Sequence, residues 1–110
     1  MNPVRQTGNI FTTPCTASNG EQTAVLLSAG SFRLEQIASF GAASPEGFWY
    51  EQDRPEWVLL ARGLATLGFE MAEPMDLKPG DYVLIPAHVR HRVEATSGDT
   101  VWLALHFTPS

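Results

Sequence analysis

The sequence predicts an all-β domain, a sandwich or barrel of short strands with one short helix before them. From Ser31 onward apolar and polar residues alternate with a period of two, which is typical of strands with one face on a core. Clusters of Gly, Pro, Asp and Ser separate these stretches. The chain has 110 residues, 44% of them hydrophobic, so it can bury one core and not two. Strands are expected within 32–35, 48–52, 57–62, 65–71, 82–85, 91–96 and 101–107.

The beginning of the chain differs from the rest in composition. Residues 1–20 are rich in Thr, Asn, Gly and Pro, and we interpret them as an arm with Ile10 and Phe11 as its anchors. The segment 21–28 contains good helix formers and ends before Gly30, so a short helix is expected there. The sequence therefore predicts an N-terminal arm over 1–20 and a barrel domain over 21–110.

Charge and cysteine usage exclude several classes of function. Seven Lys and Arg stand against twelve Asp and Glu, which gives a net charge of -5, and no basic stripe exists to bind nucleic acid or an anionic membrane. The longest apolar run, 57–61, is far shorter than the roughly 20 residues that a membrane span needs. Cys15 has no partner for an intrachain disulfide, and residues 1–6 lack the apolar core of a secretion signal. A cytoplasmic protein is expected.

The three histidines are the clearest candidates for chemistry, because all fall within the last 23 residues. In a strand, residues two apart share a face, so His91 lies on the face of Val93 and is expected to point inward. His106 shares a face with Trp102, and one strand alone leaves both orientations of that face open. His88 falls in an expected turn, where it is either exposed to solvent or close to the mouth of the barrel.

Two segments carry a family resemblance. Residues 56–63, followed after sixteen residues by 80–91, resemble the two conserved motifs of the cupin superfamily. In that family the first motif has two histidines one residue apart, then a glutamate and a glycine, and the second has a glycine, a proline and a third histidine. The resemblance implies a small single-domain cupin, whose fold is a double-stranded β-helix, also called a jelly-roll barrel.

The departures from the family pattern affect its metal ligands. Tyr50 and Gln52 occupy the positions of the two first-motif histidines, so the usual set of three histidines and one glutamate is absent. Glu56 and His91 carry over, and an amide oxygen can bind a hard or borderline cation without adding charge. The resemblance therefore implies a candidate divalent-metal site, for Zn, Ni, Fe or Mn, at Gln52, Glu56, His91 and, if its face is the inner one, His106. The expected pocket-lining residues are Tyr50, His88 and Trp102.

Three interpretations of this site stay open. The chain is a metal-dependent enzyme acting on a small molecule, a binding module that holds a small sugar-like or carboxylate ligand between aromatic walls, or a barrel with a vestigial pocket. Without a metal, Glu56 and His91 would form a buried hydrogen-bonded pair. The segments 57–61 and 101–107 carry apolar residues on both faces, more than one interior absorbs, so a homodimer is also expected.

Overall fold

The structure is a computed structural model that describes residues 6–12, 16–18 and 21–109. In these ranges the chain forms strands and no helix, which confirms the predicted all-β class, and none of their elements is a helix that could span a membrane. The strands are β1 (Thr16–Ser18), β2 (Glu21–Ala29), β3 (Phe32–Ser39), β4 (Glu56–Arg62), β5 (Ala65–Phe69), β6 (Ala72–Leu77), β7 (Tyr82–Ile85), β8 (His91–Thr96) and β9 (Thr100–Phe107).

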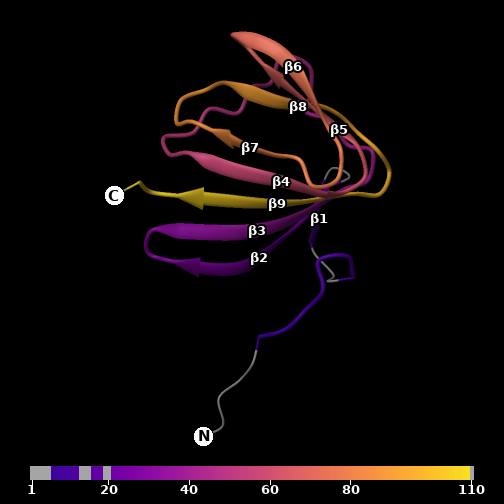
Figure 1. Cartoon of the computed structure of the whole chain (residues 1–110). Helices are drawn as coiled ribbons and strands as arrows, with labels where there is room; N and C mark the ends of the chain where they lie inside the picture. Colours follow the sequence, from indigo (N-terminus) through magenta and orange to yellow (C-terminus); the bar gives the residue numbers. More distant parts are fainter. Residues whose placement is uncertain (1–5, 13–15, 19–20, 110) are drawn as a thin grey trace, which may run out of the picture.

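Two antiparallel sheets make up the barrel. One has six strands in the order β1-β2-β3-β9-β4-β7, and the other has three in the order β6-β5-β8. In Figure 1 the three-stranded sheet lies over the six-stranded one. The apolar core lies between them, with Leu60 and Ala104 fully buried on the large sheet and Leu67 and Leu77 on the small one. This arrangement is the predicted jelly-roll barrel.

The predicted helix over 21–28 is wrong, because Glu21–Ala29 is strand β2. It pairs antiparallel with β3 from Glu21 opposite Ser39 to Ala29 opposite Phe32. Helix propensity is a weak preference, and the hydrogen bonds and packing of a long strand pair outweigh it. The glycine interpreted as a helix stop belongs instead to the two-residue connection Gly30–Ser31 of this hairpin.

The predicted strand over 48–52 is reduced to a single bridge. Tyr50 pairs with His91 alone, and each backbone N–H donates to the carbonyl of the other, at 2.7 and 3.1 Å. The predicted strand over 65–71 also ends early, at Phe69, because the chain turns there and enters β6. Met71 lies in that turn with 91% of its surface exposed. The bridge places the ring of Tyr50 beside the imidazole of His91.

Part of the expected arm packs on the barrel. Thr16–Ser18 forms β1 and pairs with the beginning of β2. The guanidinium of Arg62, at the end of β4, lies 4.6 Å from the centre of the Phe11 ring. Ile10 lies in a turn close to Phe11, and Cys15 is outside the described residues. The boundary between arm and barrel at residue 20 stays a prediction.

Candidate functional site

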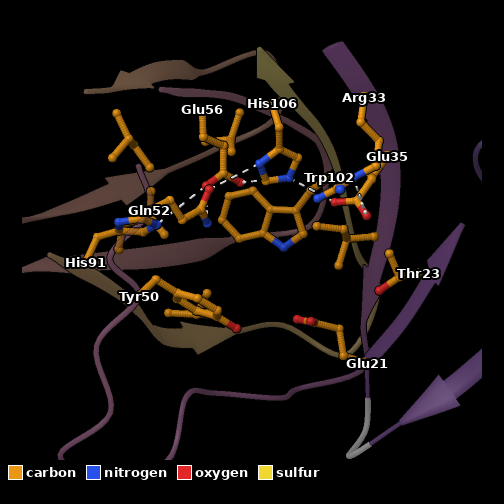
Figure 2. A pocket seen from close by; sticks show the side chains of 15 residues that line it. Glu21, Thr23, Arg33, Glu35, Tyr50, Gln52, Glu56, His91, Trp102 and His106 are labelled. Atoms are coloured by element: carbon orange, nitrogen blue, oxygen red, sulfur yellow. Dashed lines mark hydrogen bonds and ion pairs between the residues drawn. The ribbon is translucent and has the colours of Figure 1, made fainter. Parts of the chain in front are cut away.

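A cavity of about 300 Å³ lies between the two sheets. Its wall is apolar toward the core, where Ile37, Val58, Leu67, Ile85, Val93 and Trp102 line it. The remaining lining side chains are polar or charged, and Figure 2 shows them turned toward one another. They are Glu21, Thr23, Arg33, Glu35, Tyr50, Gln52, Glu56, His91 and His106.

The structure brings six of the seven residues singled out in the sequence to this cavity. Gln52, Glu56, His91, His106, Tyr50 and Trp102 line it. His88 is not among the lining residues, and 67% of its side chain is exposed, 3.8 Å from the carboxylate of Glu51. The backbone of His88 has a positive φ of 68° and donates its N–H to the carbonyl of Gln52. That turn directs the His88 side chain into solvent, while its backbone supports the Gln52 loop.

Strand pairing explains how Glu56 and His106 meet. Glu56 on β4 is the register partner of His106 on β9, and directly opposed residues of paired strands project from the same face. His106 is only 6% exposed, so its face is the inner one, which the sequence had left open. His91 comes from β8 in the opposite sheet and is also buried, as its alternation predicts.

Glu56 is the centre of the polar cluster. Its Oε1 lies 3.5 Å from Nε2 of His91 and accepts a hydrogen bond of 3.4 Å from Nε2 of Gln52. Its Oε2 lies 3.8 Å from Nε2 of His106. The predicted approach of Glu56 and His91 is therefore confirmed. One buried carboxylate therefore contacts two imidazoles, which can exchange protons, and one amide, which can donate or accept hydrogen bonds.

His106 is held from both sides of its ring. Nε2 lies 2.9 Å from Oε1 of Glu35, and Nδ1 lies 3.2 Å from Oε1 of Gln52. Both ring nitrogens of His106 are therefore engaged by side chains of the cavity wall. Arg33 adds a cation beside Glu35, with its Nε 3.3 Å from Oε2.

Sequence reasoning missed Glu21, Thr23, Arg33 and Glu35. Glu21 and Thr23 fell in the segment interpreted as a helix. Arg33 and Glu35 showed the expected alternation, but the polar face of β3 turns toward the cavity, and its apolar face, with Phe32 and Leu34, turns away from it. A period-two pattern shows that a strand has a polar and an apolar face, but it does not show which of the two is enclosed.

The environment shifts three pKa values at the cavity. For His91, burial by itself lowers the pKa, but the hydrogen bonds to Glu56 and to the Val89 carbonyl and the charge of Glu56 together raise it. Burial raises the pKa of Tyr50, with smaller contributions from the charges of Glu21 and Glu56. Burial also raises the pKa of Glu21, and the charge of Glu35 adds to this, although the hydrogen bond from Ser39 opposes it.

The raised pKa of His91 predicts a pH dependence of stability. A histidine whose pKa is higher in the folded than in the unfolded state contributes stability that is fully present below about pH 6.5 and is lost as pH rises through the folded value. Urea unfolding at about pH 5.5 and about pH 8.5 should therefore show a larger gain toward acid for the natural protein than for His91→Gln. An equal pH dependence of the two proteins would contradict this.

The side chains of the cluster do not form a metal centre as they are arranged. Within the described part of the chain, no three His, Cys, Asp or Glu side chains are grouped so that they could share an ion. Both ring nitrogens of His106 are directed at Glu35 and Gln52, which leaves Glu56 and His91 as the ligands available from the expected set. As arranged, these residues do not fit the four-ligand metal site that the resemblance implies.

Comparisons with known proteins give the following matches. The model of the cupin domain family matches residues 41–106. A crystal structure from Ralstonia eutropha JMP134, described as a "putative mannose-6-phosphate isomerase", is 40% identical, with a TM-score of 0.87 over 96% of this chain and 100% of the other. No curated protein matches.

Two more distant structures show the same fold. A cupin superfamily protein from Desulfitobacterium hafniense DCB-2 is 20% identical, with a TM-score of 0.71 over 86% of this chain and 83% of the other. KdgF from Halomonas sp. is 20% identical, with a TM-score of 0.72 over 86% of each chain.

Proposed function

The chain belongs to the cupin domain family, and we propose that its barrel cavity binds a small, uncharged molecule rich in hydroxyl groups, such as an unphosphorylated sugar. The observation that carries the proposal is the cavity itself. Its volume of about 300 Å³ is within the range of small-molecule sites, and carboxylate, imidazole, amide and phenol groups converge on it. The rings of Tyr50 and Trp102 provide flat walls for the apolar faces of a sugar ring.

The charges of the cavity favour a neutral ligand. Three carboxylates line it, those of Glu21, Glu35 and Glu56, and hydroxyl groups are the natural donors to them. Arg33 is the only arginine or lysine among the lining residues, and its Nε is already 3.3 Å from Glu35. An anionic ligand would face repulsion from three glutamates, against which the lining offers the guanidinium of Arg33 and the imidazole of His91, both already beside a glutamate. Of the two ligand classes expected from the sequence, sugar-like and carboxylate, the charges therefore favour the sugar-like one.

The 40% identical structure adds support for a sugar. Its description names a phosphorylated hexose, which is consistent with a hydroxyl-binding cavity in a close relative. For this chain the same charge argument favours the sugar without its phosphate. The His91–Glu56 pair would hydrogen-bond ligand hydroxyls and can accept or return a proton from a ligand bound there, so the site is compatible with turnover but does not require it.

Titration with mannose and with mannose 6-phosphate, followed by protein NMR, tests this proposal. Mannose should bind saturably, and the phosphate should bind no more tightly. Tyr50→Ala should weaken mannose binding, whereas Phe40→Ala, which removes an exposed aromatic ring outside the cavity, should not. The proposal would be overturned by the absence of saturable mannose binding, or by a clear preference for the phosphate.

A divalent-metal site is the second candidate, with one observation in its favour. Nδ1 of His91 lies 3.0 Å from the Val89 carbonyl and donates to it, which leaves Nε2 directed at the cavity, 3.5 Å from Glu56. Metal-binding imidazoles are commonly oriented by such a hydrogen bond. Glu56 and His91 would hold the ion. Gln52 and His106 would complete the ligand set only if the His106 ring moved away from Glu35.

Metal analysis separates the two candidates. Because His106 is engaged by Glu35 and Gln52, we expect protein purified without an affinity tag or chelator to contain much less than one equivalent of any transition metal. Incubation with EDTA should leave the melting temperature unchanged, since nothing that stabilises the folded state is removed. About one equivalent of metal, with a melting temperature that falls in EDTA, would favour the metal site.

We also propose that the chain is a homodimer in the cytoplasm. The face of the large sheet opposite the cavity carries Phe32, Leu34, Trp57, Leu59, Leu103, Leu105, Phe107, Tyr82 and Leu84. The Trp57 and Tyr82 rings lie 5.5 Å apart on it, and Tyr82 and Leu84 are more than half exposed. Such a contiguous apolar face is typical of a protein–protein contact, and a two-fold pair buries it on both copies.

Light scattering measures the predicted dimer directly. The mass should be about twice the 12.0 kDa of one chain. Leu84→Glu introduces a charge on the apolar face and should give a monomer that keeps its β-sheet circular dichroism. Met71→Glu is the control, because Met71 is exposed in the β5–β6 turn away from that face. A natural protein of 12.0 kDa would contradict the dimer.

A further inference from the structure

We propose that the ligand has two units, a sugar in the barrel cavity and a second, uncharged ring in an adjoining cavity beneath the loop 42–45. This inference rests on the proposed sugar-binding function and extends it to the ligand's size. The second cavity has a volume of about 380 Å³. It shares Glu21, Thr23, Tyr50 and Val93 with the barrel cavity, so the two spaces meet at these side chains.

The loop that covers the second cavity is held by specific hydrogen bonds. The Ser44 N–H donates to the Val93 carbonyl at 2.8 Å, and the Ser44 hydroxyl accepts from the Val93 N–H at 3.0 Å. Nη2 of Arg92 donates to the Ser44 carbonyl, and the Thr96 hydroxyl donates to the Ala42 carbonyl. The loop thus lies along β8 as a fixed wall. Because the loop is already ordered, ligand binding does not lose the conformational entropy of ordering it.

The lining of the second cavity indicates the chemistry of what it holds. Ala42, Ala43 and Pro45 present small apolar groups, and no arginine, lysine or histidine is among its lining residues. A phosphate or carboxylate would find no cation there, whereas the apolar face of a ring can pack on this surface and on the ring of Tyr50. A second sugar ring is uncharged and has an apolar face, so it fits this lining.

The junction of the two cavities has the polar groups that a linking atom requires. Figure 2 shows the Tyr50 hydroxyl directed toward the carboxylate of Glu21, with Thr23 beside them. A glycosidic oxygen and its neighbouring hydroxyls passing this point would meet the phenol and the carboxylate as hydrogen-bond partners. Each unit of a disaccharide then has a cavity of its own, and the junction contacts the bond between them.

Comparison of mannose with mannobiose by isothermal titration calorimetry tests the inference. The natural protein should bind mannobiose roughly tenfold more tightly than mannose. Ala43→Phe should fill the second cavity and remove this preference while leaving mannose affinity unchanged, which also shows that the variant is folded. Ala72→Phe is the matched control, because Ala72 is exposed on β6 and lines neither cavity, and it should keep the preference.

The outcomes distinguish this inference from the proposed function. If mannose binds and mannobiose binds no more tightly, the two-unit ligand is overturned and the sugar site stands. If mannobiose is preferred but Ala43→Phe keeps that preference, the second unit lies elsewhere and the inference fails. If neither sugar binds, the proposed function and the inference both fail.

Discussion

Replacing Leu60 by alanine is expected to lower the free energy of unfolding by about 2–5 kcal/mol. Leu60 on β4 has no exposed surface and packs with the residues that join the two sheets. Its truncation removes buried apolar surface and leaves a space that a closed barrel can fill only in part. Because a domain of this size is stable by about 5–15 kcal/mol, the loss is a large fraction of the total.

Urea unfolding followed by circular dichroism measures this change. Leu64→Ala is the matched control, since Leu64 lies in the connection between β4 and β5, is 61% exposed and is not on the proposed dimer face, and it should cost less than about 1 kcal/mol. Similar losses for the two variants would mean that the core does not lie between the sheets as described.

Replacing Glu56 by glutamine is expected to have the largest effect on ligand binding. The substitution keeps the shape of the side chain but removes the negative charge that faces His91, His106 and Gln52. A hydrogen bond to a charged group contributes about 1.5–3 kcal/mol, so mannose affinity should fall by roughly 10- to 100-fold. The cause is both the weaker contact with ligand hydroxyls and the loss of the partner that orients His91.

The control for Glu56→Gln removes the same charge elsewhere. Glu94 lies on β8, where its side chain is 42% exposed, pairs with Arg92 and does not line the cavity, so Glu94→Gln should leave the affinity unchanged. Calorimetric titration of the three proteins with mannose gives the comparison. Equal affinities for the natural protein and Glu56→Gln would show that Glu56 does not contact the ligand.

Part of the site was predictable because it depends on local sequence. The strands that carry His91 and His106 show the period of two, and the spacing from Glu56 to His91 resembles a known motif. Alternation alone predicts that His91 points inward, and the structure agrees. These predictions succeed because side-chain direction within a strand follows from strand geometry.

The parts that were wrong depend on pairing between segments, which the propensity of one segment does not reveal. Local propensity favoured a helix over 21–28, but the segment pairs with β3 along its length, with one irregularity between Val25 and Leu27, and so Glu21 becomes a lining residue of the cavity. Tyr50 is held by a single bridge to His91, which lies 41 positions later in the chain. No local pattern around Tyr50 predicts this bridge. In both cases pairing with another segment outweighs the preference of the short segment.

The sequence by itself determined the β class, the family and the pairing of Glu56 with His91. Only the tertiary structure decided which face of each strand lines the cavity, and with it the role of Glu35 and the contacts that engage both nitrogens of His106. A period of two shows that a strand has two different faces. Which of them is enclosed depends on the strands packed opposite, and in this barrel the enclosed face of β3 is the polar one.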